Sequence, residues 1–278
     1  MRTILTNCAC AVLIATATCT AGLAASQTGA ATETRAVDRP ELAEVQRLFY
    51  IGHYEAAATL ALSLRSAHPD DLDSYEIRAS ALHFQLRRAL RDATGNDIPF
   101  KQCAQCPELL KQFLNETEKG QSVSRARLQK NPTDDTAQFF LGKFDLNYVW
   151  LHLATLGRRT GWNEYWEARR SLDAVLKRNP KHVRARTARA WMDYIVDTKM
   201  SRGTRWILGG GSKKRALSAV REAANTPSDF YVHTEAQFAL WDMLVRERNF
   251  ADAAVVAREL ITDFPDNHEL VAFLKAHG

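Results

Sequence analysis

Glycine and proline are scarce in this chain of 278 residues, which contains 13 and 8 of them. A fold of many short strands needs frequent turns, so this scarcity argues against an all-β protein and favours long helices. The formal net charge is only +5, which is too small to identify a nucleic-acid-binding protein. With 46% hydrophobic and 25% charged residues, the composition excludes a disordered chain, a collagen-like fibre and a polytopic membrane protein.

Motifs for catalysis and metal binding are also missing. No Gly-x-Ser-x-Gly elbow occurs, and no two of the eight histidines have the His-x-x-x-His spacing of a zinc site. The segment Leu208–Arg215 superficially resembles a phosphate-binding loop, but it lacks the spacer and a preceding strand. We interpret it as a glycine turn with Ser212 as the N-cap of the next helix, whose first cations oppose the helix dipole unless an anion lies near. The sequence predicts no enzyme activity, no cofactor and no metal site.

The N-terminus has the pattern of a secretory signal. A positive charge at Arg2 is followed by an apolar stretch rich in Ala and Thr, and then by the small residues Ala24 and Ala25. We predict a signal peptide over residues 1–25, a flexible polar tether over residues 26–40 and a periplasmic or secreted protein with no membrane span in the mature chain. An uncleaved anchor helix and a lipid anchor at Cys19 are the alternatives.

Two cysteines remain after the signal is removed. Cys103 and Cys106 form an even pair in what should be an oxidising compartment, so we predict a disulfide that pins an insert at residues 93–107. Cys106 is placed to cap a helix beginning at Pro107, where amide groups stabilise a thiolate, so thiol–disulfide redox activity is the alternative. A thioredoxin-type site would need a preceding strand, and zinc would need two more ligands.

Helical periodicity runs through the mature chain. From Glu41 onward apolar residues recur at intervals of three and four, and turn segments at Pro69, Pro132, Pro180 and Pro265 interrupt the pattern. We predict helices that begin near residues 41, 54, 71, 107, 134, 162, 181, 212, 229, 250 and 267.

Three of these prolines share a register. An aromatic residue stands fifteen positions before the proline and an alanine twelve positions before it, as expected where two paired helices approach closely. The matching residues are Tyr54 and Ala57, Tyr165 and Ala168, and Phe250 and Ala253. Thr117 and Gly120 occupy these positions before Pro132, so that unit is interpreted as degenerate.

This register resembles the tetratricopeptide repeat (TPR). Gly52-His53-Tyr54-Glu55-Ala56-Ala57, followed by Pro69, fits the second helix of the repeat, and Leu141-Gly142 fits its first helix. The resemblance implies an all-α solenoid of helical hairpins, a TPR-like superhelix of an exported bacterial type, over residues 41–278. The proline spacings of 63, 48 and 85 exceed the family's period of about 34. Loop inserts at residues 93–107 and 201–211 account for much of this excess. A non-repeating helical bundle is the alternative.

Positive charge is concentrated in the middle of the chain. Residues 158–221 hold 17 Lys or Arg and 5 Asp or Glu, a net charge of +12, so the remainder carries −7. The resemblance places a basic, aromatic set of residues in the concave groove: Phe139, Lys143, Asn147, Arg184, Trp191 and Tyr194. Such a groove suits an acidic protein or peptide, because Arg binds carboxylates and aromatic residues bury apolar side chains.

The function implied by this resemblance is an exported adaptor or scaffold that binds another envelope protein or peptide. Other anionic envelope components, such as lipid headgroups in a peripheral association, are further candidate partners, whereas nucleic acid is not expected. One alternative is that the groove aromatics belong to the core between helices. Another is that the protein is a structural subunit of an envelope assembly.

Overall fold

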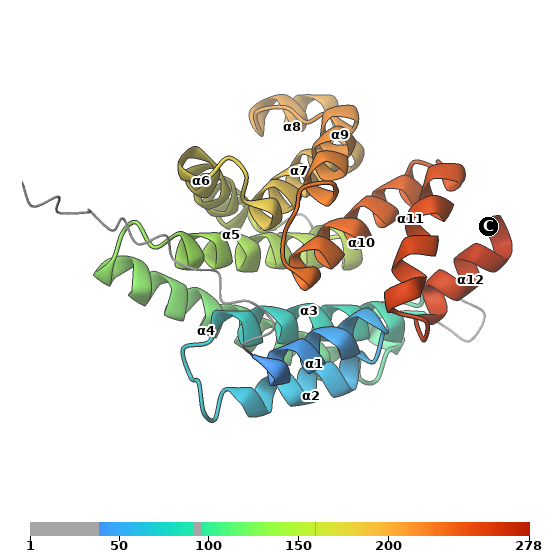
Figure 1. Ribbon diagram of the computed structural model, residues 1–278. Coiled ribbons are helices and arrows are strands. Elements are labelled where there is room, and N and C mark those ends of the chain that lie inside the picture. The colour runs from blue at the N-terminus through green and yellow to red at the C-terminus, as the bar shows by residue number, and fades with distance from the viewer. Residues whose placement is uncertain (1–38, 92–95, 159) are drawn as a thin grey trace, which may run out of the picture. The chain divides into compact units, whose positions relative to one another are not determined.

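The computed structural model describes residues 39–91, 96–158 and 160–278, so the predicted signal peptide and nearly all of the predicted tether lie outside the described residues. In the described residues, turns and loops join the helices, and the only β-type pairing is one isolated antiparallel bridge between Arg91 and Asp97. Figure 1 shows the helices in chain order. They are α1 (Pro40–Tyr50), α2 (Tyr54–Leu64), α3 (Leu72–Ala89), α4 (Cys106–Lys130), α5 (Asp135–Trp150), α6 (Trp162–Arg178), α7 (Val183–Lys199), α8 (Arg202–Ile207), α9 (Lys213–Ala224), α10 (Phe230–Arg246), α11 (Phe250–Asp263) and α12 (His268–His277).

The predicted helix starts are confirmed to within two residues. Local capping explains why they could be predicted from the sequence. The side chains of Asp134, Asn249 and Asn267 accept hydrogen bonds from backbone amides in the first turns of α5, α11 and α12. The short helix α8 was not predicted, and it lies inside the segment expected to be a loop insert. A 3₁₀ turn (Phe100–Gln102) and a π turn (Leu151–Thr155) complete the elements.

The helices form successive antiparallel hairpins. The pairs are α1 with α2, α3 with α4, α5 with α6, α7 with α9, and α10 with α11, and α12 packs on the last pair. Each pair also packs on the next along the chain, which is the arrangement of a helical-repeat protein. The described residues thus confirm the predicted all-α array of hairpins.

Small residues lie where the helices of a pair meet. Ala57, Ala168 and Ala253 are fully buried, as the register predicted. Gly120 of α4 lies instead at a contact between pairs, because a Cβ atom there would lie 2.3 Å from Cζ of Phe144 in α5, the first helix of the next pair. The unit interpreted as degenerate therefore keeps the small position of the register, and an aromatic ring from the next helix fills the space that a larger side chain would need.

The first and last pairs contact each other. The Tyr231 hydroxyl donates to the Ala43 carbonyl at 2.8 Å, and Asn267 Nδ2 donates to the Tyr50 carbonyl at 2.6 Å. The Tyr50 ring also stacks on Phe238, with the ring centroids 5.0 Å apart. In an open solenoid, the first helix of each pair leaves its inner side free. Here α1 and α10, the first helices of the first and last pairs, are joined. None of the helices in the described residues is long and apolar enough to cross a membrane.

Candidate interaction surfaces

Charged side chains meet in the interior from four helices, α3, α5, α7 and α10, each of which is the first helix of its pair. Lys143 Nζ of α5 lies 2.7 Å from Glu235 Oε1 of α10, and Arg184 Nε of α7 lies 2.7 Å from Glu235 Oε2. From α3, Asp73 Oδ1 lies 3.3 Å and Glu76 Oε2 3.6 Å from the Arg184 guanidinium. These five residues are called the inner ion cluster.

Neutral groups complete the inner ion cluster. Asn147 Nδ2 donates to Glu76 Oε1 at 3.2 Å, and the Arg184 guanidinium lies 4.7 Å from the centroid of the Phe139 ring. The side chains of Lys143 and Arg184 are only 17% and 13% exposed. Their charges are therefore satisfied by carboxylates and an aromatic ring of the same chain.

Burial and charge act against each other in this cluster. Burial alone would raise the pKa of Glu235, but the charges of Lys143 and Arg184 lower it to about 2. Burial would lower the pKa of Lys143, and Glu235 and Glu76 reverse this effect and raise it. Burial raises the pKa of Asp73 despite the neighbouring Arg184. The two cations thus hold Glu235 firmly in its ionised form.

The structure divides the six predicted groove residues into two groups. Phe139, Lys143, Asn147 and Arg184 lie in or against the inner ion cluster. Trp191 and Tyr194 lie elsewhere on α7. Tyr194 is buried and its hydroxyl donates to Glu247 Oε1 at 2.9 Å.

Trp191 belongs to a partly exposed aromatic surface. Its ring meets that of Trp150 edge to face, with centroids 5.0 Å apart, and the Arg246 guanidinium lies 5.4 Å from the Trp150 centroid and 5.7 Å from that of Trp191. All three side chains are half-buried. We call Trp150, Trp191 and Arg246 the aromatic–arginine face. Sequence reasoning missed Arg246, because only packing of α10 on α7 brings it to these rings.

Carboxylates from the acidic flanks pair with some of the cations of the basic stretch at residues 158–221. Salt bridges join its cations to acidic residues outside residues 158–221, a long-range pairing that no local signal predicts. Besides the inner ion cluster, the pairs are Arg178 with Asp135, Arg186 with Glu222, Lys213 with Glu247, and Arg221 with Asp252. Part of the uneven charge along the sequence thus serves contacts within the chain.

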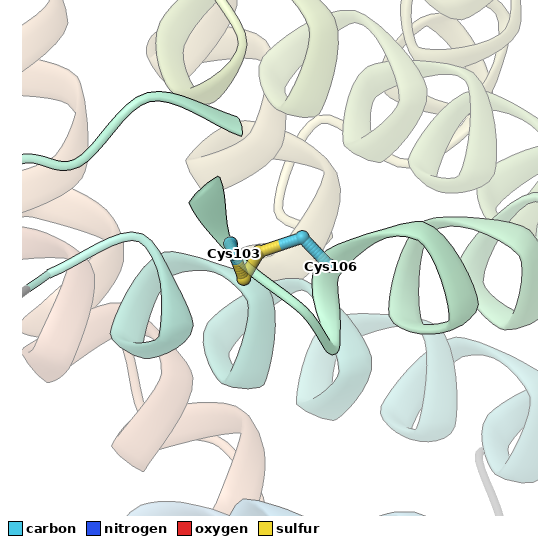
Figure 2. Close-up of a disulfide and its surroundings, with 2 residues drawn as sticks. All are labelled: Cys103 and Cys106. Atoms are coloured by element: carbon cyan, nitrogen blue, oxygen red, sulfur yellow. A yellow bond between two sulfur atoms is a disulfide. The ribbon is translucent and has the colours of Figure 1, made fainter. Parts of the chain in front are cut away.

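The two remaining cysteines lie at the start of α4. Figure 2 shows their two sulfur atoms next to each other. The Cα atoms lie 5.4 Å apart. Cys106 is the first residue of α4 and Gln105 is the N-cap, so the expectation that Cys106 caps the helix is wrong by one residue. Both side chains are buried, Cys106 completely. Thiol–disulfide exchange requires access to a sulfur atom, so this burial favours a structural role over redox activity.

The glycine turn before α9 packs tightly on α7. Ser212 caps α9 as predicted, and its hydroxyl accepts from the Arg215 amide. The Asp197 carboxylate accepts from the Lys213 amide at 2.8 Å, so the anion needed beside these cations comes from the chain itself. At Gly211 a Cβ atom would lie 2.6 Å from the Asp193 carbonyl oxygen, which explains why this position needs glycine.

The TPR-like motif of the first hairpin has a structural task. Gly52 has a φ of +84°, and its carbonyl accepts from Arg88 Nη1 at 2.7 Å. The same guanidinium lies 4.4 Å from the centroid of the Tyr54 ring. These residues border an open groove of about 790 Å³ along α1 and α2. In the described part of the chain, no group of three or more His, Cys, Asp or Glu side chains could hold a metal ion.

No protein-family model matches the chain, and no curated protein matches it. Among solved structures, the chain is similar to the crystal structure of a thermophilic TPR protein from Thermus thermophilus. The two are 17% identical with a TM-score of 0.46, and the match covers 86% of this chain and 98% of that chain. The fold described above rests on the helix pairs themselves.

Proposed function

We propose that this chain is an exported helical-repeat scaffold that binds an acidic segment of another envelope protein through the aromatic–arginine face. The observation that supports this site is Arg246, whose guanidinium lies over two tryptophan rings while all three side chains remain partly exposed. Arg246 Nε also donates to Asp242 Oδ1 at 3.0 Å, but this pair is open to solvent, with side chains 28% and 36% exposed, so a ligand carboxylate can replace Asp242 without displacing a buried group. Arg and Trp are enriched among residues that dominate binding energy, since they combine a large contact area with a directed charge.

The inner ion cluster has a different task in this proposal. Lys143 and Arg184 already bind Glu235, Asp73 and Glu76, so a ligand carboxylate would have to displace a buried internal one. Of the six groove residues, Trp191 is therefore the proposed contact. The other five hold the helices that carry it in place.

Site-specific crosslinking tests the binding face. A photoreactive phenylalanine analogue at position 191 should crosslink one envelope protein, and the same analogue at Trp162, which is 44% exposed on α6, should not. Arg246→Glu should reduce the yield at position 191 by about tenfold, because the guanidinium is the only cation of this face. Equal yields from both positions, or a yield unchanged by Arg246→Glu, would contradict the proposed site.

Export is tested on the protein itself. The mass of the protein purified from the envelope should match cleavage after Ala24 or Ala25, and a thiol reagent should label Cys103 and Cys106 only after reduction. An intact N-terminus, or labelling without reduction, would contradict this part of the proposal.

A further inference from the structure

Two neighbouring apolar side chains on α8 stand out into solvent. Trp206 is 84% exposed and Ile207 66%, the highest values among the large apolar residues of the described chain. Soluble proteins usually cover a tryptophan, because its large ring gains much from burial. An exposed pair of this kind marks a contact surface.

This exposure does not come from a loosely held segment. The next residue, Leu208, is only 1% exposed, and its carbonyl accepts from the Tyr165 hydroxyl at 3.1 Å and from Arg169 Nη1 at 2.6 Å. Within α8, Arg205 Nη1 donates to the Asp197 carbonyl at 3.1 Å. The backbone of α8 is thus fixed to α6 and α7 while the Trp206 and Ile207 side chains point outward.

Cations that have no acidic partner in the described part of the chain lie close to the apolar pair in sequence. Between Asp197 and Glu222 the chain has seven Lys or Arg residues and no acidic residue. Four of them are exposed and have no acidic partner among the described residues; they are Lys199, Arg202, Lys214 and Arg215. Arg202 precedes Trp206 by four residues, so both lie on one face of α8. Lys214 and Arg215 lie in the first turn of α9. This turn is held close to α8 by Asp197, which accepts hydrogen bonds from both Arg205 of α8 and the Lys213 amide.

We propose that α8 and the first turn of α9 form a docking surface for an anionic phospholipid bilayer. Trp206 and Ile207 enter the interfacial region, where tryptophan is favoured, and the four cations face the lipid phosphates. Side chains that protrude suit a deformable lipid surface better than a protein partner, which would need a matching pocket. This surface is separate from the aromatic–arginine face, so either proposal can fail alone.

Vesicle flotation of the full chain tests the docking surface. The chain should float with vesicles of phosphatidylethanolamine and about 30% phosphatidylglycerol, and at least tenfold less with pure phosphatidylcholine. The double variant Trp206→Ala/Ile207→Ala should lose at least about tenfold in affinity, because it removes the apolar anchor. Lys214→Glu/Arg215→Glu should lose about as much by reversing two charges.

Matched controls separate this surface from general effects. Leu62→Ala/Val255→Ala removes two exposed apolar side chains elsewhere, and Lys119→Glu/Arg258→Glu makes the same charge change in the middle of α4 and α11. Both controls should bind within about twofold of the unmodified chain. A loss in the controls equal to that in the α8 variants would overturn the proposal.

A probe at the site is needed because the apolar residues 8–23 of the full chain are themselves suited to bind lipid. Lipids with brominated acyl chains should quench tryptophan fluorescence on binding. Trp206→Phe should keep the binding and remove this quenching, whereas Trp162→Phe should keep both. Quenching that survives Trp206→Phe, equal affinity for neutral vesicles, or a protein captured through Trp206 without any lipid binding would each overturn the proposal.

Discussion

The inner ion cluster and the α8 docking surface both draw on the basic stretch of residues 158–221, and they use its charge in opposite ways. Arg184 is only 13% exposed and lies against Glu235, Asp73 and Glu76, which come from α10 and α3. Lys214 and Arg215 are exposed and have no acidic partner in the described chain. A cation's place in the sequence therefore does not reveal its role. That role depends on which helix of another pair packs against it.

The largest expected effect is on stability, at the inner ion cluster. Among the described residues, Arg184→Ala leaves Glu235 and Glu76 with only Lys143, and Asp73 with only Arg39, so the free energy of unfolding should fall by about 3–5 kcal/mol in urea denaturation. Arg215→Ala removes an exposed cation of the same stretch and should change it by less than about 0.5 kcal/mol. Similar losses in both variants would abolish the distinction between the two regions.

The second largest expected effect is that of acid, which should weaken the inner ion cluster. The pKa of Glu235 is lowered to about 2, so its contribution is complete above its ordinary pKa of 4.5 and is lost as the pH falls toward 2. The free energy of unfolding should therefore drop by about 2–3 kcal/mol over this range. Glu235→Gln should flatten most of that fall, measured by urea denaturation at each pH. An unchanged acid limb in this variant would place the sensitive carboxylate elsewhere.

A third prediction concerns the attachment of α8 and α9 to α7. Gly211→Ala places a Cβ atom 2.6 Å from the Asp193 carbonyl oxygen and 2.9 Å from the Asp197 amide nitrogen. It should cost about 1–3 kcal/mol in the free energy of unfolding and also weaken vesicle binding. Gly203→Ala, on α8 itself, meets no atom within 4 Å and should be neutral or slightly stabilising. Thermal unfolding and flotation of both variants measure the difference.

The smallest expected change in stability is the one caused by salt. Salt should nevertheless distinguish the two regions. Raising NaCl from about 0.1 M to about 0.5 M shortens the screening length and should weaken vesicle binding severalfold. The same change should alter the free energy of unfolding by less than about 0.5 kcal/mol, because the cluster is largely shielded from ions. Salt-insensitive flotation would show that Trp206 and Ile207 act without the surrounding cations.

Most of the fold could be predicted from local signals in the sequence. Asp134, Asn249 and Asn267 cap the helices that follow them, so the boundaries could be predicted from single residues near turns. The helix α8 was not predicted because its six residues are too few to show a hydrophobic periodicity.

The candidate surfaces depended on contacts between distant segments. Arg184 and Glu235 are 51 residues apart, and no spacing rule relates them. Arg246 likewise reaches Trp150 only through the packing of α10. The sequence showed that a basic and aromatic region exists, but not which of its side chains would be covered by the chain itself.

The contact between the first and last hairpins has a consequence for how the protein unfolds. Repeat arrays often lose structure one unit at a time from an end, because each unit touches only its neighbours. Here the Tyr231–Ala43 and Asn267–Tyr50 hydrogen bonds span 188 and 217 residues and tie the two ends together. Fraying at either terminus must break contacts at the other. The array should therefore melt as one cooperative unit, and should form slowly because its closing contacts are so distant in sequence.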